Sequence, residues 1–153
     1  MLQRIQSVYL LASLALSILP FFIPVGFLSD GITEMQLTPY GLKDSAGTVM
    51  SDVQSYFFYV PLTATISFVL ISIFSFKNRK AQMKWVRMTF ILIALTIALI
   101  ALYIKDATNM HSALNFSLGF GLFMPILALA FNRLALRAIQ KDEDLIKSVD
   151  RIR

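Results

Sequence analysis

The sequence predicts an all-α membrane protein with four transmembrane helices, and three observations support this class. Mean hydropathy is +0.69 and 15% of the residues are charged, whereas roughly 25% is typical of soluble domains. Four apolar segments each approach the roughly 20 residues that a helix needs to cross about 30 Å of hydrocarbon. None of the four contains Asp, Glu, Lys, Arg or His, and an ionised group in lipid costs about 3 kcal/mol even on the mildest scale.

The first predicted span runs from Val8 to Leu28. Its apolar run is longer than the roughly 7 to 15 residues of a secretory signal, so we expect an uncleaved helix. Pro20 and Pro24 lack the amide hydrogen that a helix interior needs, so this helix should kink or fray toward its far end.

An outer loop, residues 29–55, follows the first span. Asp30 and Gly31 stand between two short runs that look extended, and this pair favours a two-residue hairpin turn because both residues tolerate positive φ. An irregular connector is the alternative, since an isolated hairpin is only marginally stable in water. The loop is therefore either a small β-hairpin on the outer surface or irregular chain.

The remaining predicted spans are residues 56–76, 88–104 and 113–131. In the last of these, Gly119 and Gly121 would permit close helix packing, and Pro125 would free the carbonyl of Gly121 and kink the helix near mid-bilayer. The kink is a static packing feature or, alternatively, a hinge or pore element. Asn115 is the strongest polar group expected at membrane depth. Hydroxyl groups within the other spans should form hydrogen bonds across helices: Thr63, Thr65, Ser67, Thr89 and Thr96.

A cytoplasmic helical tail, residues 132–153, is predicted after the fourth span. More than half of its last seventeen residues are charged, and no proline or glycine interrupts it, so one helix should continue from Ala113 to about Val149 and project into water. Leu145, Val149 and Ile152 recur at helical spacing and form an apolar stripe. Such a stripe requires a partner, which is the basic loop near Trp85, the lipid surface or another protein.

The distribution of basic residues predicts the orientation. Twelve of the 14 Lys and Arg residues lie on the side of the two termini, and only Lys43 and Lys105 lie on the other. The positive-inside rule therefore puts both termini in the cytoplasm, as an even number of spans requires. Trp85 and the aromatic run at residues 56–59 fall at expected water boundaries, where amphipathic rings prefer to lie.

Candidate chemistry is sparse. The chain has no cysteine and one histidine, His111, so thiol chemistry is excluded and a metal site would depend on carboxylates or carbonyls; a surface histidine is the simpler interpretation. The spans lack the buried carboxylates of proton-coupled carriers, and no catalytic, cofactor or metal site is predicted. The net charge of +5 serves membrane orientation, not nucleic-acid binding.

The two ends of the chain supply the candidate interaction site. Both leave the membrane on the same side, so Arg4 is expected to meet an acidic residue of the tail, either Asp142, Glu143 or Asp144. The alternative is that Arg4 anchors the first helix to anionic lipid. The full candidate set is Arg4, Asp142, Glu143, Asp144, Leu145, Val149, Asp150, Arg151, Ile152 and Arg153.

The same ends carry a resemblance to a known family. Gln3-Arg4-Ile5-Gln6 at the start and Lys141-Asp142-Glu143, Asp150-Arg151 and Arg153 at the finish resemble the family called domain of unknown function 4293, small four-span inner-membrane proteins of the Bacteroidota. The resemblance implies a bacterial cytoplasmic membrane with cytoplasmic ends. It implies no activity, and in the middle of the chain it extends only to hydropathy.

Together these observations favour a non-catalytic accessory or interaction subunit that presents a charged cytoplasmic tail to a protein partner or to a second copy of itself. The alternative is a small oligomeric channel or transporter with a constriction at Gly119, Gly121 and Pro125. An enzyme acting at the cytoplasmic face is the third class, disfavoured because no nucleophile, metal cluster or cofactor motif is present.

Overall fold

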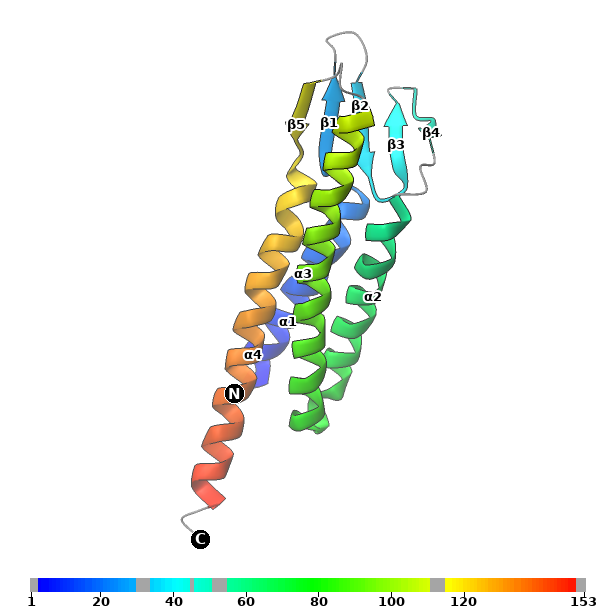
Figure 1. The fold of residues 1–153 in the computed structure, drawn as a ribbon. Helices are drawn as coiled ribbons and strands as arrows, with labels where there is room; N and C mark the ends of the chain where they lie inside the picture. Colours follow the sequence, from blue (N-terminus) through cyan, green and yellow to red (C-terminus); the bar gives the residue numbers. More distant parts are fainter. Residues whose placement is uncertain (1–2, 30–33, 45, 51–54, 111–114, 151–153) are drawn as a thin grey trace.

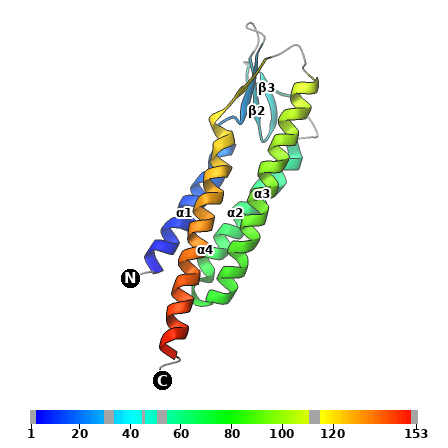
Figure 2. The ribbon, with the colours of Figure 1, turned by 60° about the vertical axis from the view of Figure 1, so that its left-hand side comes forward.

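Four helices form an elongated bundle with a small antiparallel sheet at one end (Figure 1). The computed structural model describes residues 3–29, 34–44, 46–50, 55–110 and 115–150. The start of the first helix and the end of the last lie at the end of the bundle opposite the sheet (Figures 1 and 2). We call this the terminal end, and the other the sheet end.

The long helices are α1 (Gln3–Ile18), α2 (Ser55–Phe74), α3 (Arg79–Met110) and α4 (Phe123–Asp150). Three short 3-10 helices adjoin them: η1 (Leu19–Phe21) after α1, η2 (Ser75–Lys77) after α2 and η3 (Phe120–Leu122) before α4. Three helical segments are long and apolar enough to cross a membrane: Tyr59–Lys77, Arg79–Met110 and Phe120–Ile146. The first helix contributes a shorter apolar segment, Ile5–Phe21. At about 1.5 Å per residue, the 32 residues of α3 extend about 48 Å, which exceeds the hydrocarbon thickness.

The predicted first span is wrong at its far end. α1 stops at Ile18, and the chain passes through η1, which contains Pro20, into strand β1 (Gly26–Ser29). Pro20 and Pro24 follow the last residue of α1, and a residue without an amide hydrogen disfavours continuation of the helix. The residues after them are apolar because they face a protein core, not because they continue the helix.

The sheet has five strands in the order β4-β3-β2-β1-β5, all neighbours being antiparallel. Besides β1, the strands are β2 (Glu34–Thr38), β3 (Gly41–Asp44), β4 (Val49–Met50) and β5 (Asn115–Leu118). The predicted hairpin exists, since Ser29 pairs with Glu34 and Gly26 with Leu37. Its turn at Asp30-Gly31 lies outside the described residues. The irregular-connector alternative and the expectation of an entirely helical fold are therefore both wrong for this segment.

One face of the sheet packs on the last turns of α3. Buried side chains of the sheet and of the chain entering it meet buried side chains of α3 in one apolar core, formed by Val25, Leu28, Leu37, Leu42, Ile100, Tyr103 and Ala107. Strands with one face on a helix alternate in burial, as β1 does. This core explains why α3 is much longer than the bilayer requires.

The fourth helix begins ten residues later than predicted. Asn115 lies in β5 and is exposed at the sheet edge, so the expectation that it lies at membrane depth is wrong. β5 pairs with β1 in register from Asn115↔Ser29 to Leu118↔Gly26, and the chain then turns through η3 into α4. A segment of only four residues is too short for its pattern to separate a strand from a helical turn, and here backbone pairing with β1 decides.

The helices are apolar outside and contain polar groups inside. Exposed aliphatic side chains on the four helices include Val8, Leu11, Val60, Leu70, Ile91, Leu95, Leu102, Ile126, Leu127 and Leu134, whereas Gln6, Ser13, Ser17, Thr65, Ser72, Gln82, Thr89, Thr96, Asn132 and Asp142 are buried. Soluble proteins show the opposite arrangement. This distribution and the three long apolar helices indicate a protein that associates with a membrane.

Most of the hydroxyl groups do not join helices. The five predicted to do so, Thr63, Thr65, Ser67, Thr89 and Thr96, each donate to a carbonyl three or four residues earlier in the same helix, at 2.8 to 3.1 Å. This prediction is wrong because the local carbonyl is always within reach of a helical hydroxyl. Hydrogen bonds between helices include those from Ser13 Oγ to the Ala128 carbonyl and from Gln82 Nε2 to the Ser72 carbonyl.

Candidate interaction site at the terminal end

The candidate site is built around Asp142, one of the three tail carboxylates that the sequence singles out. Asp142 follows Ala128, Asn132, Ala135 and Ile139 on the inner face of α4, all of them buried, because steps of three or four residues keep one side of a helix in contact with its neighbours. Only 5% of Asp142 is exposed. A carboxylate this buried requires partners.

Two other helices supply those partners. Gln6 Nε2 of α1 donates a hydrogen bond to Asp142 Oδ2 and a longer one, 3.4 Å, to the carbonyl of Ala138. Arg79 at the start of α3 places its Nη1 3.6 Å from Asp142 Oδ2. We call Gln6, Arg79 and Asp142 the polar clamp, since they join α1, α3 and α4 at the terminal end.

The ion pair in the clamp is incomplete. Arg79 Nη1 is buried and has no hydrogen-bond partner among the described residues, and its 3.6 Å separation from the carboxylate is longer than the roughly 2.7 to 2.9 Å of a charge-assisted hydrogen bond. The Arg79 side chain is 22% exposed and that of Asp142 6%. Partial burial strengthens the attraction between the two charges but also costs hydration, and the pair lacks bidentate geometry. It therefore positions the helices more than it stabilises them.

Above the clamp lies a small apolar core. Leu10 of α1, Val86 of α3 and Ala135, Leu136 and Ile139 of α4 are buried together, with Tyr9, Ile73 and Met83 packed against them. Tyr9 also contacts Phe131 of α4, their ring centroids being 6.3 Å apart. These contacts fix the height of Arg79 and Asp142 relative to α1, so the clamp is preorganised.

The other two tail carboxylates that the sequence singles out, Glu143 and Asp144, are less buried than Asp142. Glu143 and Asp144 line a groove between α3 and α4 together with Met83, Arg87 and Gln140. Asp144 is exposed and Glu143 is partly buried. This groove carries both signs of charge and is a recessed polar surface of the terminal end.

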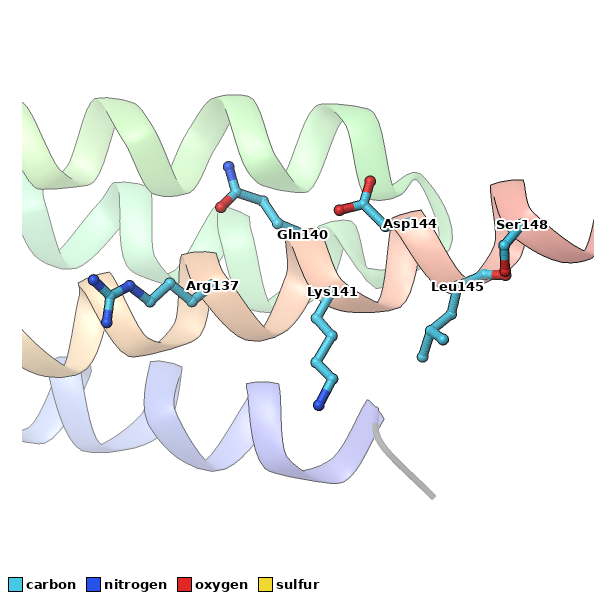
Figure 3. Close-up of a pocket in the computed structure, with 6 residues that line it drawn as sticks. All are labelled: Arg137, Gln140, Lys141, Asp144, Leu145 and Ser148. Atoms are coloured by element: carbon cyan, nitrogen blue, oxygen red, sulfur yellow. The ribbon is translucent and has the colours of Figure 1, made fainter.

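The final turns of α4 extend past the ends of the other helices (Figures 1 and 2). Arg137, Gln140, Lys141, Asp144, Leu145 and Ser148 line a shallow depression along this projecting segment (Figure 3). Leu145 is 47% exposed and the adjacent Ile146 is 44% exposed. An apolar pair on a charged, projecting helix is a feature of a contact surface.

The predicted pairing of Arg4 with the tail stays a prediction, because the Arg4 side chain lies outside the described residues. The structure does join α1 to the acidic tail, but through Gln6 and Asp142. Asp142 has Arg79 as its basic partner. Helix α4 continues to Asp150, in line with the predicted end near Val149. The side chains of Val149 and Asp150, and the whole of Arg151, Ile152 and Arg153, lie outside the described residues, as does His111.

The predicted Gly-Pro kink is wrong in position. Gly119 and Gly121 precede α4, and Pro125 is the third residue of α4, where the missing amide hydrogen breaks no helical bond. The glycines do serve close packing, but of backbone on backbone: Gly121 N donates to the Pro24 carbonyl and Gly119 N to that of Val25. A Cβ at either glycine would lie 2.3 Å from a carbonyl oxygen. The proline inside a long helix is Pro61 of α2.

Three important residues escaped the sequence interpretation. The sequence gives no sign that Gln6 and Arg79 contact the tail. It does give a sign that Asp142 is buried, because Asp142 lies three residues after Ile139 on one apolar stripe of the helix. Asn132 of α4 is fully buried, and neither its Oδ1 nor its Nδ2 has a hydrogen-bond partner among the described residues. Its place between Ala128 and Ala135 on the same stripe is the available signal.

Metal chemistry finds no support in the described part of the chain, where no three His, Asp or Glu side chains lie close enough to hold a metal ion. The family model for a domain of unknown function (DUF4293) matches residues 2–152. No curated protein matches the chain. The chain belongs to the DUF4293 family, which it covers over essentially its whole length.

Proposed function

We propose that this member of the family is a non-catalytic, four-span protein of the bacterial cytoplasmic membrane whose terminal end docks a partner protein on the cytoplasmic side. The observation that carries the proposal is the projection of α4 beyond the bundle (Figure 1), with exposed Leu145 and Ile146 on it. A helix that only crossed the bilayer would need neither the extra length nor the apolar pair.

The four-span topology is supported by length and by charge. α1 and η1 together cover about 28 Å at helical rise, which is close to the hydrocarbon thickness, although α1 alone is shorter than the other three. Twelve of 14 basic residues belong to the side of the chain ends, which places the terminal end in the cytoplasm by the positive-inside rule.

The aromatic residues at the sheet end support the placement of the other boundary. Phe21, Tyr40 and Tyr59 form a cluster where the sheet meets the bundle, with ring centroids 5.6 to 6.1 Å apart. Tyrosine prefers the membrane–water interface because its ring is amphipathic. The sheet then sits at the outer surface, and the clamp at the inner one.

The channel alternative has lost its main support. Its constriction required Gly119, Gly121 and Pro125 inside a membrane helix, whereas Gly119 precedes the apolar segment Phe120–Ile146 and Gly121 lies in its first turn, where both glycines pack on the backbone at residues 23–25. No described feature replaces them as a pore, and the docking proposal uses the terminal end as it stands.

Site-specific photo-crosslinking in living cells tests the proposal. A photoreactive residue at Leu145 or Ser148 should give an adduct of one defined mass, whereas the same residue at exposed Thr48 on the sheet end should not. An adduct of twice the chain's mass would identify a second copy as the partner. Reversing Asp144 to Lys should weaken the adduct if the charged groove contributes. Absence of any protein adduct from both tail positions, with the protein correctly inserted, would reject the docking role.

A further inference from the structure

The outward face of α4 carries three basic side chains at consecutive helical turns: Arg133, Arg137 and Lys141. We call these residues the basic stripe. Residues four apart on a helix lie about 6 Å from one another, so the three charges run along roughly 12 Å of the helix. All three are exposed, and none has an ion-pair or hydrogen-bond partner among the described residues.

Two acids close to the stripe, Asp142 and Asp144, are directed away from it. Asp142 is turned inward, toward Gln6 and Arg79. Asp144 shares a depression with Arg137 and Lys141, but it points toward α3 whereas Lys141 points toward α1 (Figure 3). The outward face therefore presents a local excess of positive charge.

An apolar surface leads directly into the stripe. Ile126, Leu127 and Leu134 are 40 to 46% exposed on the same helix, and Arg133 lies inside the apolar segment Phe120–Ile146. Helix α1, which packs along α4, also exposes Val8 and Leu11, each more than half exposed. An Arg in this setting extends its head group toward the interface.

From this juxtaposition we infer that the basic stripe and the adjoining apolar surface of α1 and α4 form a binding site for an anionic phospholipid. The phosphate of the head group lies against Arg137 and Lys141, with Arg133 on its membrane side. The acyl chains lie along the exposed aliphatic side chains. A lipid fits better than an acidic protein segment because the surface is basic at one end and apolar at the other, so its ligand should be anionic at one end and apolar at the other.

The Arg residues of the stripe suit a phosphate in particular. A guanidinium can give two parallel hydrogen bonds to phosphate oxygens, whereas a Lys ammonium acts as a point charge. The hydroxyl of Ser148, in the same depression, now donates to the Leu145 carbonyl and is not needed by the site. Leu145 lines the same depression as Arg137 and Lys141, but the lipid site depends on the basic side chains and the docking function on Leu145 and Ile146, so each can fail alone.

The experiment is a lipid titration of the purified full chain, with native mass spectrometry to count retained lipids. Phosphatidylglycerol is the probe and phosphatidylcholine the zwitterionic reference. The test variant changes Arg133, Arg137 and Lys141 to Gln. The matched control changes Lys77, Lys80 and Lys84, which are exposed at the same end, to Gln and so removes the same charge.

Each basic residue near a membrane surface contributes about a fivefold gain in affinity for anionic lipid. The test variant, which loses all three contacts to the head group, should therefore lose roughly 100-fold in apparent affinity for phosphatidylglycerol. The control variant should lose much less, because Lys77, Lys80 and Lys84 do not belong to the basic stripe. Arg137→Lys should retain binding partly. Equal losses in test and control would overturn the site, because net charge alone would then explain binding.

Two further outcomes would also overturn it. Complete competition by inorganic phosphate would mean that the stripe binds any anion and that the apolar surface plays no part. Unchanged lipid retention in the test variant, together with loss of the protein adduct from Leu145, would assign the stripe to the protein partner.

Discussion

The two ends of the bundle are held together by different physics. At the sheet end, strands from distant parts of the chain pair through backbone hydrogen bonds, and an apolar core joins them to α3. At the terminal end, three helices meet at a carboxylate, an amide and a guanidinium. The paired backbone groups and buried apolar side chains of the sheet end cannot easily exchange partners. The amide, carboxylate and guanidinium side chains of the terminal end can. An interaction surface is expected at the second kind of end.

The largest effect should come from the glycine contacts at the sheet end. Gly121→Val would place a side chain against the carbonyls at positions 23 and 24, where a Cβ already comes within 2.3 Å, so we expect a loss of about 3 kcal/mol or more in the free energy of unfolding. Ser117→Ala on exposed β5 is the matched control. Unfolding in detergent with denaturant measures both, and equal stability of the two variants would contradict the role of the close contact.

The apolar core of the sheet end should be nearly as sensitive. Ile100 is fully buried between α3 and the sheet, and Ile100→Ala should cost about 3 kcal/mol through lost burial and the cavity left behind. The exposed Leu102, two residues further along α3, provides the control, since Leu102→Ala should change stability little. Similar losses at positions 100 and 102 would show that the sheet does not pack on α3 as described.

At the terminal end we expect a smaller effect. Asp142→Ala leaves the Arg79 guanidinium partly buried without its counter-ion and should cost about 2 kcal/mol, less than a fully buried pair because Arg79 is 22% exposed. Asp144→Ala, at an exposed position, should be nearly neutral. The double variant Arg79→Leu with Asp142→Leu should recover part of the loss. Additive losses in that double variant would show that the two residues do not interact.

The smallest change, and one of opposite sign, is expected at Asn132. Its buried amide has no partner among the described residues, so Asn132→Leu removes an unsatisfied polar group while conserving most of the volume, and should raise stability by about 1 kcal/mol. Asn132→Ala, which also leaves a cavity, should not. A loss of stability in the Leu variant would indicate that the amide is hydrogen-bonded, for example to an internal water.

Hydropathy predicted the helices but not their ends. Val25 and Leu28 are as apolar as any membrane residue, yet they face a protein core formed with α3, and a short apolar run carries no signal that separates strand from helix. The β5 strand could not be predicted from local sequence because its partner, β1, lies almost ninety residues earlier. The hairpin was predictable because its pairing is local.

At the terminal end, the sequence predicted the length of the helix but not which of its charged side chains are buried. The charged tail and its helical length followed from composition, but a run such as Lys141 to Asp144 reads as a solvated surface. Only the helical register distinguishes Asp142, which is buried on the same side of α4 as Ile139, from the partly buried Glu143 and the exposed Asp144. The partner Arg79 could not be predicted because the loop and the tail come together only in the folded bundle.

The two ends of the bundle should be exposed on opposite sides of the membrane, and cysteine labelling can test this. The chain has no cysteine of its own, so Thr48→Cys on the sheet end and Ser148→Cys on the terminal end each provide a single thiol at an exposed position. A membrane-impermeant thiol reagent is added to cells with a permeable outer barrier, before and after lysis. The account predicts that position 48 labels in intact cells and that position 148 labels only after lysis. Labelling of position 148 before lysis, or equal labelling of both, would contradict it.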